Sequence, residues 1–240
     1  MQLTDAAAVK KLLARHGFTF SKALGQNFLI NPSVCPRMAD ACGADFATGV
    51  LEIGPGIGVL TKELAKRAGK VAAIELDQRL IPVLNETLAE FDNISILSGD
   101  AMKLDLKELI AREFGDMPVV VCANLPYYIT SPLIMRLLEQ RLPLQSITVM
   151  VQKEAADRLC ARVGSRESGA VTVAVHFYAE PKRLFIVSPG SFLPPPRVDS
   201  AVLRMDLLEH PPVDADPKAL FRIVRAGFAQ RRKTLCNALS

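Results

Sequence analysis

Cysteine and histidine are scarce in this sequence and widely spread. The five cysteines form no Cys-x-x-Cys pair and the three histidines lie far apart; these residues are Cys35, Cys42, Cys122, Cys160, Cys236, His16, His176 and His210. Zinc sites and disulfide frameworks depend on recurrent close spacings of such residues. We therefore expect neither a disulfide framework nor a bound metal, as is typical of a protein in a reducing compartment.

Long apolar runs are also missing. No stretch reaches the roughly 18 apolar residues that a membrane-spanning helix needs, and the N-terminus lacks a signal-peptide pattern. We expect a soluble, cytoplasmic, monomeric protein with no membrane partner. Hydrophobic residues make up 50% of the 240 positions, which is enough for one α/β domain and a small appendage.

Acidic residues are absent from the last twenty positions. This tail holds five of the 29 Lys and Arg residues, namely Arg222, Arg225, Arg231, Arg232 and Lys233. The rest of the chain contains 24 basic and 25 acidic residues, so the net charge of +4 originates in the tail. Concentrated positive charge favours contact with a polyanion. A solvated basic helix explains the charge alone equally well.

Short apolar runs alternate with helical segments over about the first 150 residues. The runs that predict strands are residues 50–53, 71–74, 94–97, 118–123 and 147–151. Helices are expected to open at Asn31-Pro32 with Asn31 as the cap, to cover residues 59–68, to follow a cap at Asp77, and to begin at Ser131-Pro132. The alternation indicates a doubly wound, Rossmann-like α/β fold whose sheet is mostly parallel.

The pattern changes after residue 170. The valines at residues 171–175 alternate with small or polar residues and predict a strand, and residues 184–187 and 201–203 predict two more. These strands give the sheet an antiparallel end. Residues 192–196 hold too many prolines for either a helix or a strand.

A linker and a final helix are predicted beyond the last strand. Residues 209–217 contain three prolines and three acids, and a helical pattern follows from Lys218 to the end. We therefore divide the chain into an α/β domain over residues 1–207 and a small C-terminal helical subdomain over residues 208–240.

The first four predicted strands each end in a polar or glycine-rich element. These are the turn at residues 54–58, Glu75, Asp100 and Asn124. In open α/β sheets, ligands bind beyond the carboxyl ends of the strands. Glycines let the backbone approach a ligand closely, and the helix N-terminus that follows favours a carboxylate. The four strand ends together predict a ligand site.

The glycine turn by itself has two interpretations. A dinucleotide fingerprint requires Gly or Ala where this sequence has Val59, which disfavours a nicotinamide dehydrogenase. Glu75 lies 21 residues after Gly54, where an acid accepts both ribose hydroxyls. Asp100 is placed to accept from an adenine amino group. Each acid alone is equally well explained as a helix cap, but with the turn they favour a nucleoside site.

The run Asn124-Leu125-Pro126-Tyr127 is the most specific pattern. The exocyclic amine of a purine is a poor nucleophile because its lone pair is delocalised into the ring. The Asn124 amide oxygen and the Leu125 carbonyl can accept its two hydrogens and localise that lone pair. Pro126 stiffens the backbone, and Tyr127 offers a stacking face worth about 1–3 kcal/mol per base. This pattern indicates amine methylation by positioning and electrostatics.

Five groups of residues occur in the order seen in one known family. They are Leu24-Gly25-Gln26-Asn27-Phe28-Leu29, Glu52-Ile53-Gly54-Pro55-Gly56, Asn124-Leu125-Pro126-Tyr127-Tyr128, Phe192-x-Pro194-x-Pro196-x-Val198-Asp199-Ser200 and the tail at residues 228–235. Together they resemble the KsgA/RsmA family of ribosomal RNA adenine dimethyltransferases. The resemblance extends from about Phe18 to Leu239.

The resemblance implies a methyltransferase that uses S-adenosylmethionine. The implied cofactor site comprises Gln26, Asn27, Leu29, Gly54, Gly56, Glu75, Leu76, Asp100, Ala101 and Asn124. The implied catalytic residues are Asn124, Leu125, Tyr127 and Phe192, with Tyr127 and Phe192 stacked on the target adenine. The substrate would be two adjacent adenines near the 3′ end of 16S rRNA in the small ribosomal subunit, and the product N6,N6-dimethyladenosine. The basic tail would bind this RNA.

The sequence differs from the family pattern in two places, and two alternative functions remain to be considered. Family members usually continue a few dozen residues beyond the basic segment, so a shortened helical subdomain is expected, and Ser168 stands where tyrosine is common. A 23S rRNA adenine dimethyltransferase of the antibiotic-resistance type shares every motif above, although Leu125 and the Arg-Arg-Lys-Thr-Leu tail favour the small subunit. A non-catalytic ribosome-assembly factor on the same fold is disfavoured by the complete motif at residues 124–127.

Overall fold

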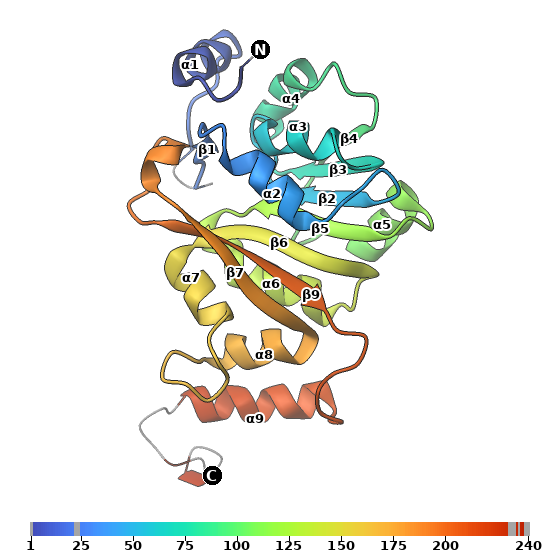
Figure 1. Cartoon of the computed structure of the whole chain (residues 1–240), viewed down its shortest axis with the longest axis vertical. Helices are drawn as coiled ribbons and strands as arrows, with labels where there is room; N and C mark the ends of the chain where they lie inside the picture. The colour runs from blue at the N-terminus through green and yellow to red at the C-terminus, as the bar shows by residue number, and fades with distance from the viewer. Residues whose placement is uncertain (1, 22–24, 230–233, 235, 238–240) are drawn as a thin grey trace.

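A seven-stranded sheet forms the centre of the computed structural model, which describes residues 2–21, 25–229, 234, 236 and 237 (Figure 1). Its strand order is β4-β3-β2-β5-β6-β9-β7. The strands are β2 (Gly49–Ile53), β3 (Lys70–Glu75), β4 (Ile94–Ser98), β5 (Val119–Asn124), β6 (Leu144–Gln152), β7 (Ala179–Val187) and β9 (Ser200–Leu207). The first five in that order are parallel to one another. Strand β9 pairs antiparallel with β6, and β7 pairs antiparallel with β9. The predicted fold class is confirmed.

Helices cover both faces of the sheet. One apolar core includes side chains of α1 (Ala6–Arg15), α2 (Val34–Cys42), α3 (Val59–Ala65) and α4 (Ile81–Thr87). The opposite core includes those of α5 (Leu106–Phe114), α6 (Thr130–Glu139), α7 (Lys153–Leu159) and α8 (Ala170–Tyr178). Side chains alternate between the faces along each strand, so Val50 lies in the first core and Leu51 in the second. Burial on both faces explains the nearly continuous apolar strands.

The strand order reverses between β2 and β5. From β2 the chain adds β3 and β4 on one side, and then β5 and β6 on the other. Such a reversal opens a crevice at the carboxyl ends of the two strands, where ligands of this architecture bind. The predicted ligand residues lie at the carboxyl ends of β2 and β5 and of the neighbouring strands β3 and β4.

A second, two-stranded sheet closes one side of this crevice. It pairs β1 (Phe28–Leu29) with β8 (Phe192–Leu193) antiparallel, and Leu29 lies opposite Phe192. The prediction that residues 192–196 form neither helix nor strand is wrong for the first two residues. Phe192 and Leu193 precede the prolines, so their backbone is free to pair. The pairing brings two segments more than 160 positions apart to the crevice.

The valines at residues 171–175 lie in helix α8, so the predicted strand is wrong. The segment is apolar around most of the helix because it packs on two sides. Val175 belongs to the core under the sheet, while Ala174 and Phe177 pack against Phe221. A short apolar run buried on two sides cannot be distinguished from a strand by its periodicity.

Helix α2 begins at Val34, three residues after the predicted Asn31 cap. Ser33 occupies the cap position, but its side chain makes no capping hydrogen bond to the helix backbone. The Asn31 Oδ1 atom accepts from the Ser33 N–H at 3.0 Å and forms a turn before the helix. The same side-chain chemistry that caps helices also makes such turns. Asp77 does cap the 3₁₀ helix η1 (Gln78–Leu80), as predicted.

The last described helix, α9 (Pro217–Ala229), lies beside α8 at the end of the molecule opposite α1 (Figure 1). Its buried Phe221 packs edge-on against Phe177, with ring centroids 5.3 Å apart. Arg222 and Arg225 are exposed. The remaining predicted RNA-binding residues lie outside the described part of the chain; they are Arg231, Arg232 and Lys233. Among the described helices, none has the length and apolar character to traverse a bilayer.

Candidate active site

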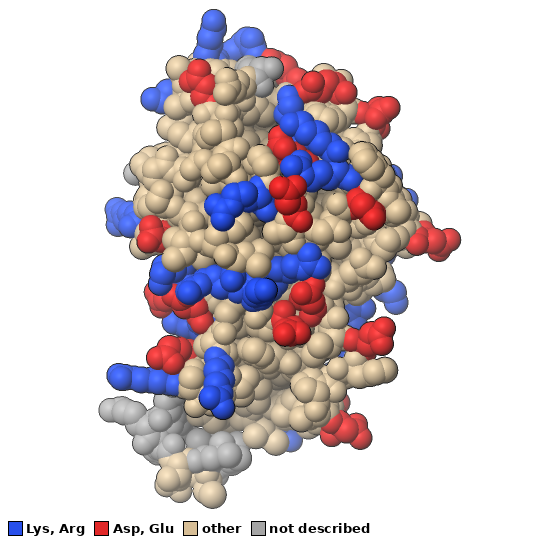
Figure 2. All heavy atoms as spheres, in the orientation of Figure 1, with Lys and Arg blue, Asp and Glu red and all other residues tan. Residues whose placement is uncertain are grey.

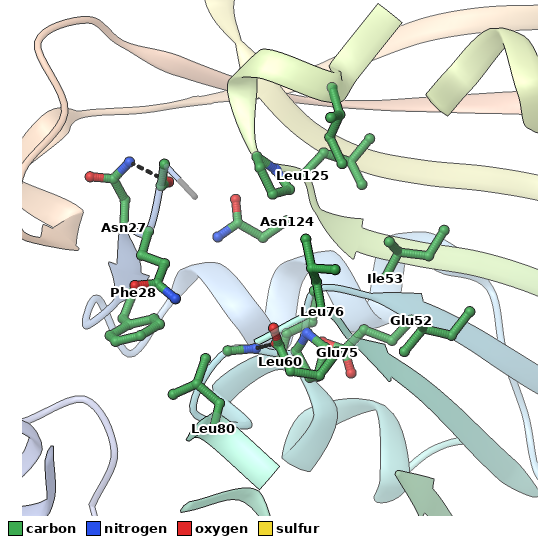
Figure 3. Close-up of a pocket in the computed structure, with 18 of the residues that line it drawn as sticks. Asn27, Phe28, Glu52, Ile53, Leu60, Glu75, Leu76, Leu80, Asn124 and Leu125 are labelled. Carbon is green, nitrogen blue, oxygen red and sulfur yellow. Dashed lines mark hydrogen bonds between the residues drawn. The ribbon is translucent and has the colours of Figure 1, made fainter. Parts of the chain in front are cut away.

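One pocket opens at the carboxyl ends of the parallel strands and is partly drawn in Figure 3. Its empty space, open solvent included, is about 1030 Å³. All thirteen residues predicted for cofactor binding or catalysis line it, namely Gln26, Asn27, Leu29, Gly54, Gly56, Glu75, Leu76, Asp100, Ala101, Asn124, Leu125, Tyr127 and Phe192. The fold thus gathers residues that are dispersed over most of the sequence.

The glycine turn after β2 forms the floor of the pocket. Gly54 and Gly56 have φ angles of +75° and +62°, in the left-handed region that favours glycine. A Cβ atom on Gly56 would lie 3.1 Å from the Phe28 ring, and one on Gly54 would lie 3.9 Å from the Asn124 carbonyl oxygen. The turn therefore lies directly against the Asn-Leu-Pro-Tyr segment, and a ligand on it is close to that segment.

Glu75 ends β3 as a buried carboxylate with both oxygens engaged. The Gly56 N–H donates to its Oε2 at 3.1 Å and the Asp77 N–H to its Oε1 at 2.8 Å. Burial raises the pKa of Glu75, and these two bonds oppose that rise. A carboxylate oxygen accepts more than one hydrogen bond. Glu75 can therefore still accept from ribose hydroxyls, which fits a nucleoside.

Asp100 follows β4 on the next part of the rim. Its Oδ1 accepts from the Met102 N–H at 2.9 Å, and its Oδ2 lies 3.7 Å from the Lys103 Nζ. Asp100 therefore does cap a local turn, as the alternative explanation of this acid as a cap suggested. Leu76 and Ala101, also in the lining, add apolar surface near the two acids. Carboxylates beside apolar surface suit the polar edge and the flat face of a base.

The N-terminal segment contributes a third wall. Its Asn27 amide donates to the Gly25 carbonyl at 3.1 Å (Figure 3). The Gln26 amide is bonded to protein groups on both sides, accepting from the Ser21 N–H and donating to Asp77, each at 2.8 Å. Leu29 is buried through its pairing with β8. Sequence reasoning missed Asp77 as the partner of Gln26.

Asn124 projects its amide into the pocket from the end of β5 (Figure 3). The Leu125 N–H donates to the Met150 carbonyl of β6 at 3.1 Å, and the Leu125 side chain is buried. The Pro126 carbonyl accepts from the Ile129 N–H at 3.2 Å as the chain enters the 3₁₀ helix η2 (Tyr127–Ile129). The backbone that presents Asn124 is thus fixed before any ligand binds.

Tyr127 and Phe192 are the two aromatic residues predicted for base stacking. The Tyr127 hydroxyl and the Ser200 Oγ form a hydrogen bond of 2.7 Å. Burial raises the pKa of Tyr127, and the bond to Ser200 opposes the rise. Phe192 is buried beside Leu29. Ser200 was part of a quoted motif, but no sequence signal assigned it to Tyr127.

Two further residues in the lining were not predicted for the site. The Tyr128 side chain is 52% exposed, and its ring would lie 3.5 Å from a Cβ atom on Gly25. Glu52 is buried, and burial raises its pKa to about 8. Thr61 is near enough to oppose this rise, but the Glu52 Oε2 has no hydrogen-bond partner among the described residues. Glu52 therefore favours its neutral form.

Within the described residues, no group of three or more His, Cys, Asp or Glu side chains is placed to hold a metal ion. The pocket offers carboxylates to hydroxyls and amines, and apolar surface to a base. The residues that line it can bind and orient a nucleoside without a metal ligand set.

A sheet with this order, and a pocket at its strand ends beside an Asn-Leu-Pro-Tyr segment, belong to an S-adenosylmethionine-dependent methyltransferase. The sequence model of the ribosomal RNA adenine dimethylase family matches residues 17–240. The chain belongs to this family.

Several curated relatives carry the name ribosomal RNA small subunit methyltransferase A. The protein from Geobacillus thermodenitrificans is 50% identical over 232 residues, which cover 96% of this chain and 79% of that protein. The protein from Alkaliphilus oremlandii is 43% identical over 240 residues, which cover 100% of this chain and 84% of that protein. The family prediction from the motifs is confirmed.

Solved structures with the same fold include two transferases. A dimethyladenosine transferase from Plasmodium falciparum superimposes with a TM-score of 0.76 at 30% identity, covering 88% of this chain and 74% of that one. The 23S rRNA methyltransferase ErmE superimposes with a TM-score of 0.73 at 28% identity, covering 89% and 83%. The fold is therefore shared by a dimethyladenosine transferase and a 23S rRNA methyltransferase.

Proposed function

We propose that the protein transfers methyl groups from S-adenosylmethionine to N6 of two adjacent adenines near the 3′ end of 16S rRNA in the small ribosomal subunit. The product is N6,N6-dimethyladenosine. The observation that carries the proposal is the meeting of the glycine turn, Glu75 and the segment at residues 124–127 in one pocket. The small-subunit substrate is supported by the names of relatives 43–50% identical to this chain.

The cofactor binds along the strand ends in this proposal. Glu75 accepts from the ribose hydroxyls, Asp100 accepts from the adenine amine, and Leu76 and Ala101 contact the base. The turn at Gly54 and Gly56 and the segment with Asn27 and Leu29 enclose the remainder, and Asn124 reaches it as well. S-adenosylmethionine, when bound, supplies an electrophilic methyl group on a sulfonium centre.

Asn124 and Leu125 make the target amine nucleophilic. The Asn124 side-chain amide oxygen and the Leu125 backbone carbonyl oxygen accept its two hydrogens. This draws the nitrogen towards tetrahedral geometry and localises its lone pair. The methylated amine loses its extra proton readily, so no strong protein base is needed. Because the backbone of Leu125 is already hydrogen-bonded to β6, these acceptors are preorganised, which is the main source of electrostatic catalysis.

Tyr127 and Phe192 enclose the target base. An adenine that leaves its stack in RNA loses stacking energy of a few kcal/mol. Aromatic side chains at the pocket compensate for this loss. Tyr127 comes from the end of β5 and Phe192 from β8, so the two rings belong to segments that meet only in the folded protein.

RNA binding is assigned to the C-terminal subdomain. We place the boundary between residues 207 and 208, and β9 ends at Leu207 while α9 begins at Pro217. Apart from the tail, Lys and Arg side chains also form a band over β7 and β9 (Figure 2). Two of the basic residues of these strands, Arg183 and Arg204, pair with Asp157 and Asp206. The exposed arginines of α9 are therefore the stronger candidates for phosphate contacts.

We further propose a cytoplasmic monomer that needs no metal. Reduced cysteines fit this location: Cys35, Cys42 and Cys122 are buried as free thiols. In this proposal the α/β domain performs the chemistry, and the tail selects the RNA. A 23S rRNA specificity is disfavoured, because the relatives named for the small subunit share more identity with this chain than ErmE does.

A methyl-transfer assay tests the proposed function. Purified protein, labelled S-adenosylmethionine and small subunits that lack the modification are incubated together, with free 23S rRNA as the competing substrate. Label in the small subunit supports the proposal. Label in 23S rRNA alone would contradict the substrate, and no label in either RNA would contradict the activity.

A further inference from the structure

Gln26 and Asp77 join two segments on the rim of the cofactor pocket that lie 51 positions apart. The Gln26 Nε2 donates to the Asp77 Oδ2 at 2.8 Å, and the Gln26 Oε1 accepts from the Ser21 N–H at 2.8 Å. The Gln26 amide is thus held from both sides by protein groups. This differs from the role that the sequence suggested, in which Gln26 binds the cofactor.

Asp77 is the centre of this arrangement and is almost fully buried. Arg79 donates from its Nε to Oδ1 at 2.8 Å and from its Nη2 to Oδ2 at 2.6 Å. These bonds, chiefly, hold the pKa of Asp77 below its ordinary value. The Arg79 guanidinium also lies 4.9 Å from the centre of the Phe18 ring. Asp77 is therefore a charged acceptor, and hydrogen bonds to charged groups are the stronger ones.

The backbone of Asp77 continues the connection into the cofactor site. Its N–H donates to the Glu75 Oε1 at 2.8 Å, and the Glu75 Oε2 accepts from the Gly56 N–H at 3.1 Å. Leu76 lies between the two acids and lines the pocket. An unbroken set of hydrogen bonds therefore runs from Gln26 through Asp77 and Glu75 to the glycine turn.

We propose that Gln26 and Asp77 form a clamp, and that Gln26 is a positioning residue rather than a cofactor ligand. The clamp fastens the segment that carries Asn27 and Leu29 to the end of β3, and so fixes two walls of the pocket relative to each other. Among the residues that the structure describes, the strand hydrogen bonds that otherwise hold this segment are those of the two-residue pairing of β1 with β8. The inference rests on the proposed cofactor site and deepens it.

An exchange of the two side-chain types tests the clamp. Gln26→Glu places a second carboxylate against Asp77, and Asp77→Asn alone removes the charge that Gln26 and Arg79 contact. The combination Gln26→Glu with Asp77→Asn restores one carboxylate facing one amide. We measure S-adenosylhomocysteine affinity by calorimetry for all four proteins, with the exposed neighbour Gln78→Ala as the matched control.

The clamp predicts that Gln26→Glu weakens binding about tenfold, the order expected for a lost charge-assisted bond. The double variant should recover to within about threefold of the natural sequence, and Gln78→Ala should bind normally. A double variant no better than Gln26→Glu would overturn the proposal. Unchanged affinity in Gln26→Glu would overturn it as well.

Hydrogen exchange in the protein without ligand separates the clamp from the cofactor assignment. Amides of residues 25–29 should exchange faster in Gln26→Glu and return to the natural rate in the double variant. Absence of this rescue contradicts the clamp, whatever the ligand is. If the exchange rate returned to normal in the double variant but the natural sequence bound no S-adenosylhomocysteine, the clamp would be supported and the proposed function contradicted.

Discussion

The Tyr127 hydroxyl and the Ser200 Oγ are 2.7 Å apart, and this bond reaches across β6. Tyr127 follows β5, whereas Ser200 begins β9 and is fully buried. The hydroxyl of Tyr127 is thus fixed at a point in the sheet before RNA arrives. A ring held in this way loses less freedom when a base stacks on it.

The first prediction concerns this pair. Tyr127→Leu removes the stacking face and should abolish most methyl transfer, and Phe192→Leu should lower activity for the same reason. Tyr127→Phe keeps the face and should retain most turnover, with a loss of about tenfold or less for one hydrogen bond. Ser200→Ala should match Tyr127→Phe, and the double variant should be no worse than either. Steady-state methyl transfer measures all five.

Tyr178→Phe serves as the control, because it loses the same hydroxyl in α8 at the packing site of α9. If Tyr127→Phe proved as inactive as Tyr127→Leu, the hydroxyl would carry the function and stacking would be the wrong explanation. Additive losses in the Ser200→Ala double variant would show that the two hydroxyls act separately.

The second prediction concerns cofactor affinity. Glu75→Ala should weaken S-adenosylmethionine binding by about 1–3 kcal/mol, because ribose hydroxyls lose their acceptor. Gly54→Val should block binding more strongly, because φ at this position is +75° and a side chain would enter the site. Calorimetry measures both, and RNA affinity should not change. Normal cofactor affinity in the two variants would refute the assignment of this site.

The third prediction separates chemistry from binding at Asn124. Asn124→Ala should lower kcat by about 100-fold or more, the usual cost of losing one preorganised polar group. RNA affinity should change much less, because the acceptor acts on the amine in the transition state. Turnover is measured with saturating cofactor, since Asn124 also contacts the cofactor in the proposed site. Full turnover under these conditions would exclude the role.

The fourth prediction is a pH dependence of stability from Glu52. Burial raises its pKa to about 8 in the folded protein, against 4.5 ordinarily. The folded state therefore holds this proton more tightly, so its stabilising contribution is complete below about pH 4.5 and is lost as pH rises towards about 8. Glu52→Gln mimics the neutral acid and should remove this part of the dependence.

Urea unfolding at about pH 5 and about pH 9 measures the Glu52 effect. Glu52→Gln should match the natural sequence at the lower pH and exceed it by a few kcal/mol at the higher pH, at about 1.4 kcal/mol per pKa unit. The exposed Glu139→Gln is the control. Equal differences in the free energy of unfolding at both pH values would disprove the assignment.

The fifth prediction concerns the basic tail. Neutralising Arg231, Arg232 and Lys233 together should make the log–log salt dependence of RNA affinity shallower by about 2–3 units. Arg222→Gln with Arg225→Gln should act in the same direction by about 1–2 units. Cofactor affinity should stay the same. The exposed Lys10 and Lys11 of α1, at the far end of the molecule, provide the control (Figure 1). An unchanged slope would assign the tail to packing or a protein partner.

The sequence predicted the sheet well because its strands are buried on both faces and end in ligand-type residues. Runs such as residues 50–53 and 118–123 leave no polar side for solvent, and their carboxyl ends meet by the rules of parallel topology. Gly54, Glu75, Asp100 and Asn124 could therefore be assigned to one pocket from their positions alone.

The errors and omissions arise from contacts between distant segments. Helix α8 was taken for a strand because α9 buries its second side, which no local pattern reveals. The Tyr127 bond to Ser200 and the Gln26 bond to Asp77 span 73 and 51 positions. Hydroxyl and amide side chains can form hydrogen bonds with many kinds of group, so their spacing in a sequence does not identify the partner.

Mass spectrometry of the nucleosides made by the protein gives the most direct answer about its activity. Small subunits that lack the modification are treated with the protein and S-adenosylmethionine, and the 16S rRNA is digested and mapped. We expect N6,N6-dimethyladenosine at two adjacent positions near the 3′ end, and none with Asn124→Ala. Dimethyladenosine formed in 23S rRNA instead, or equal product from Asn124→Ala, would contradict the function proposed for this pocket.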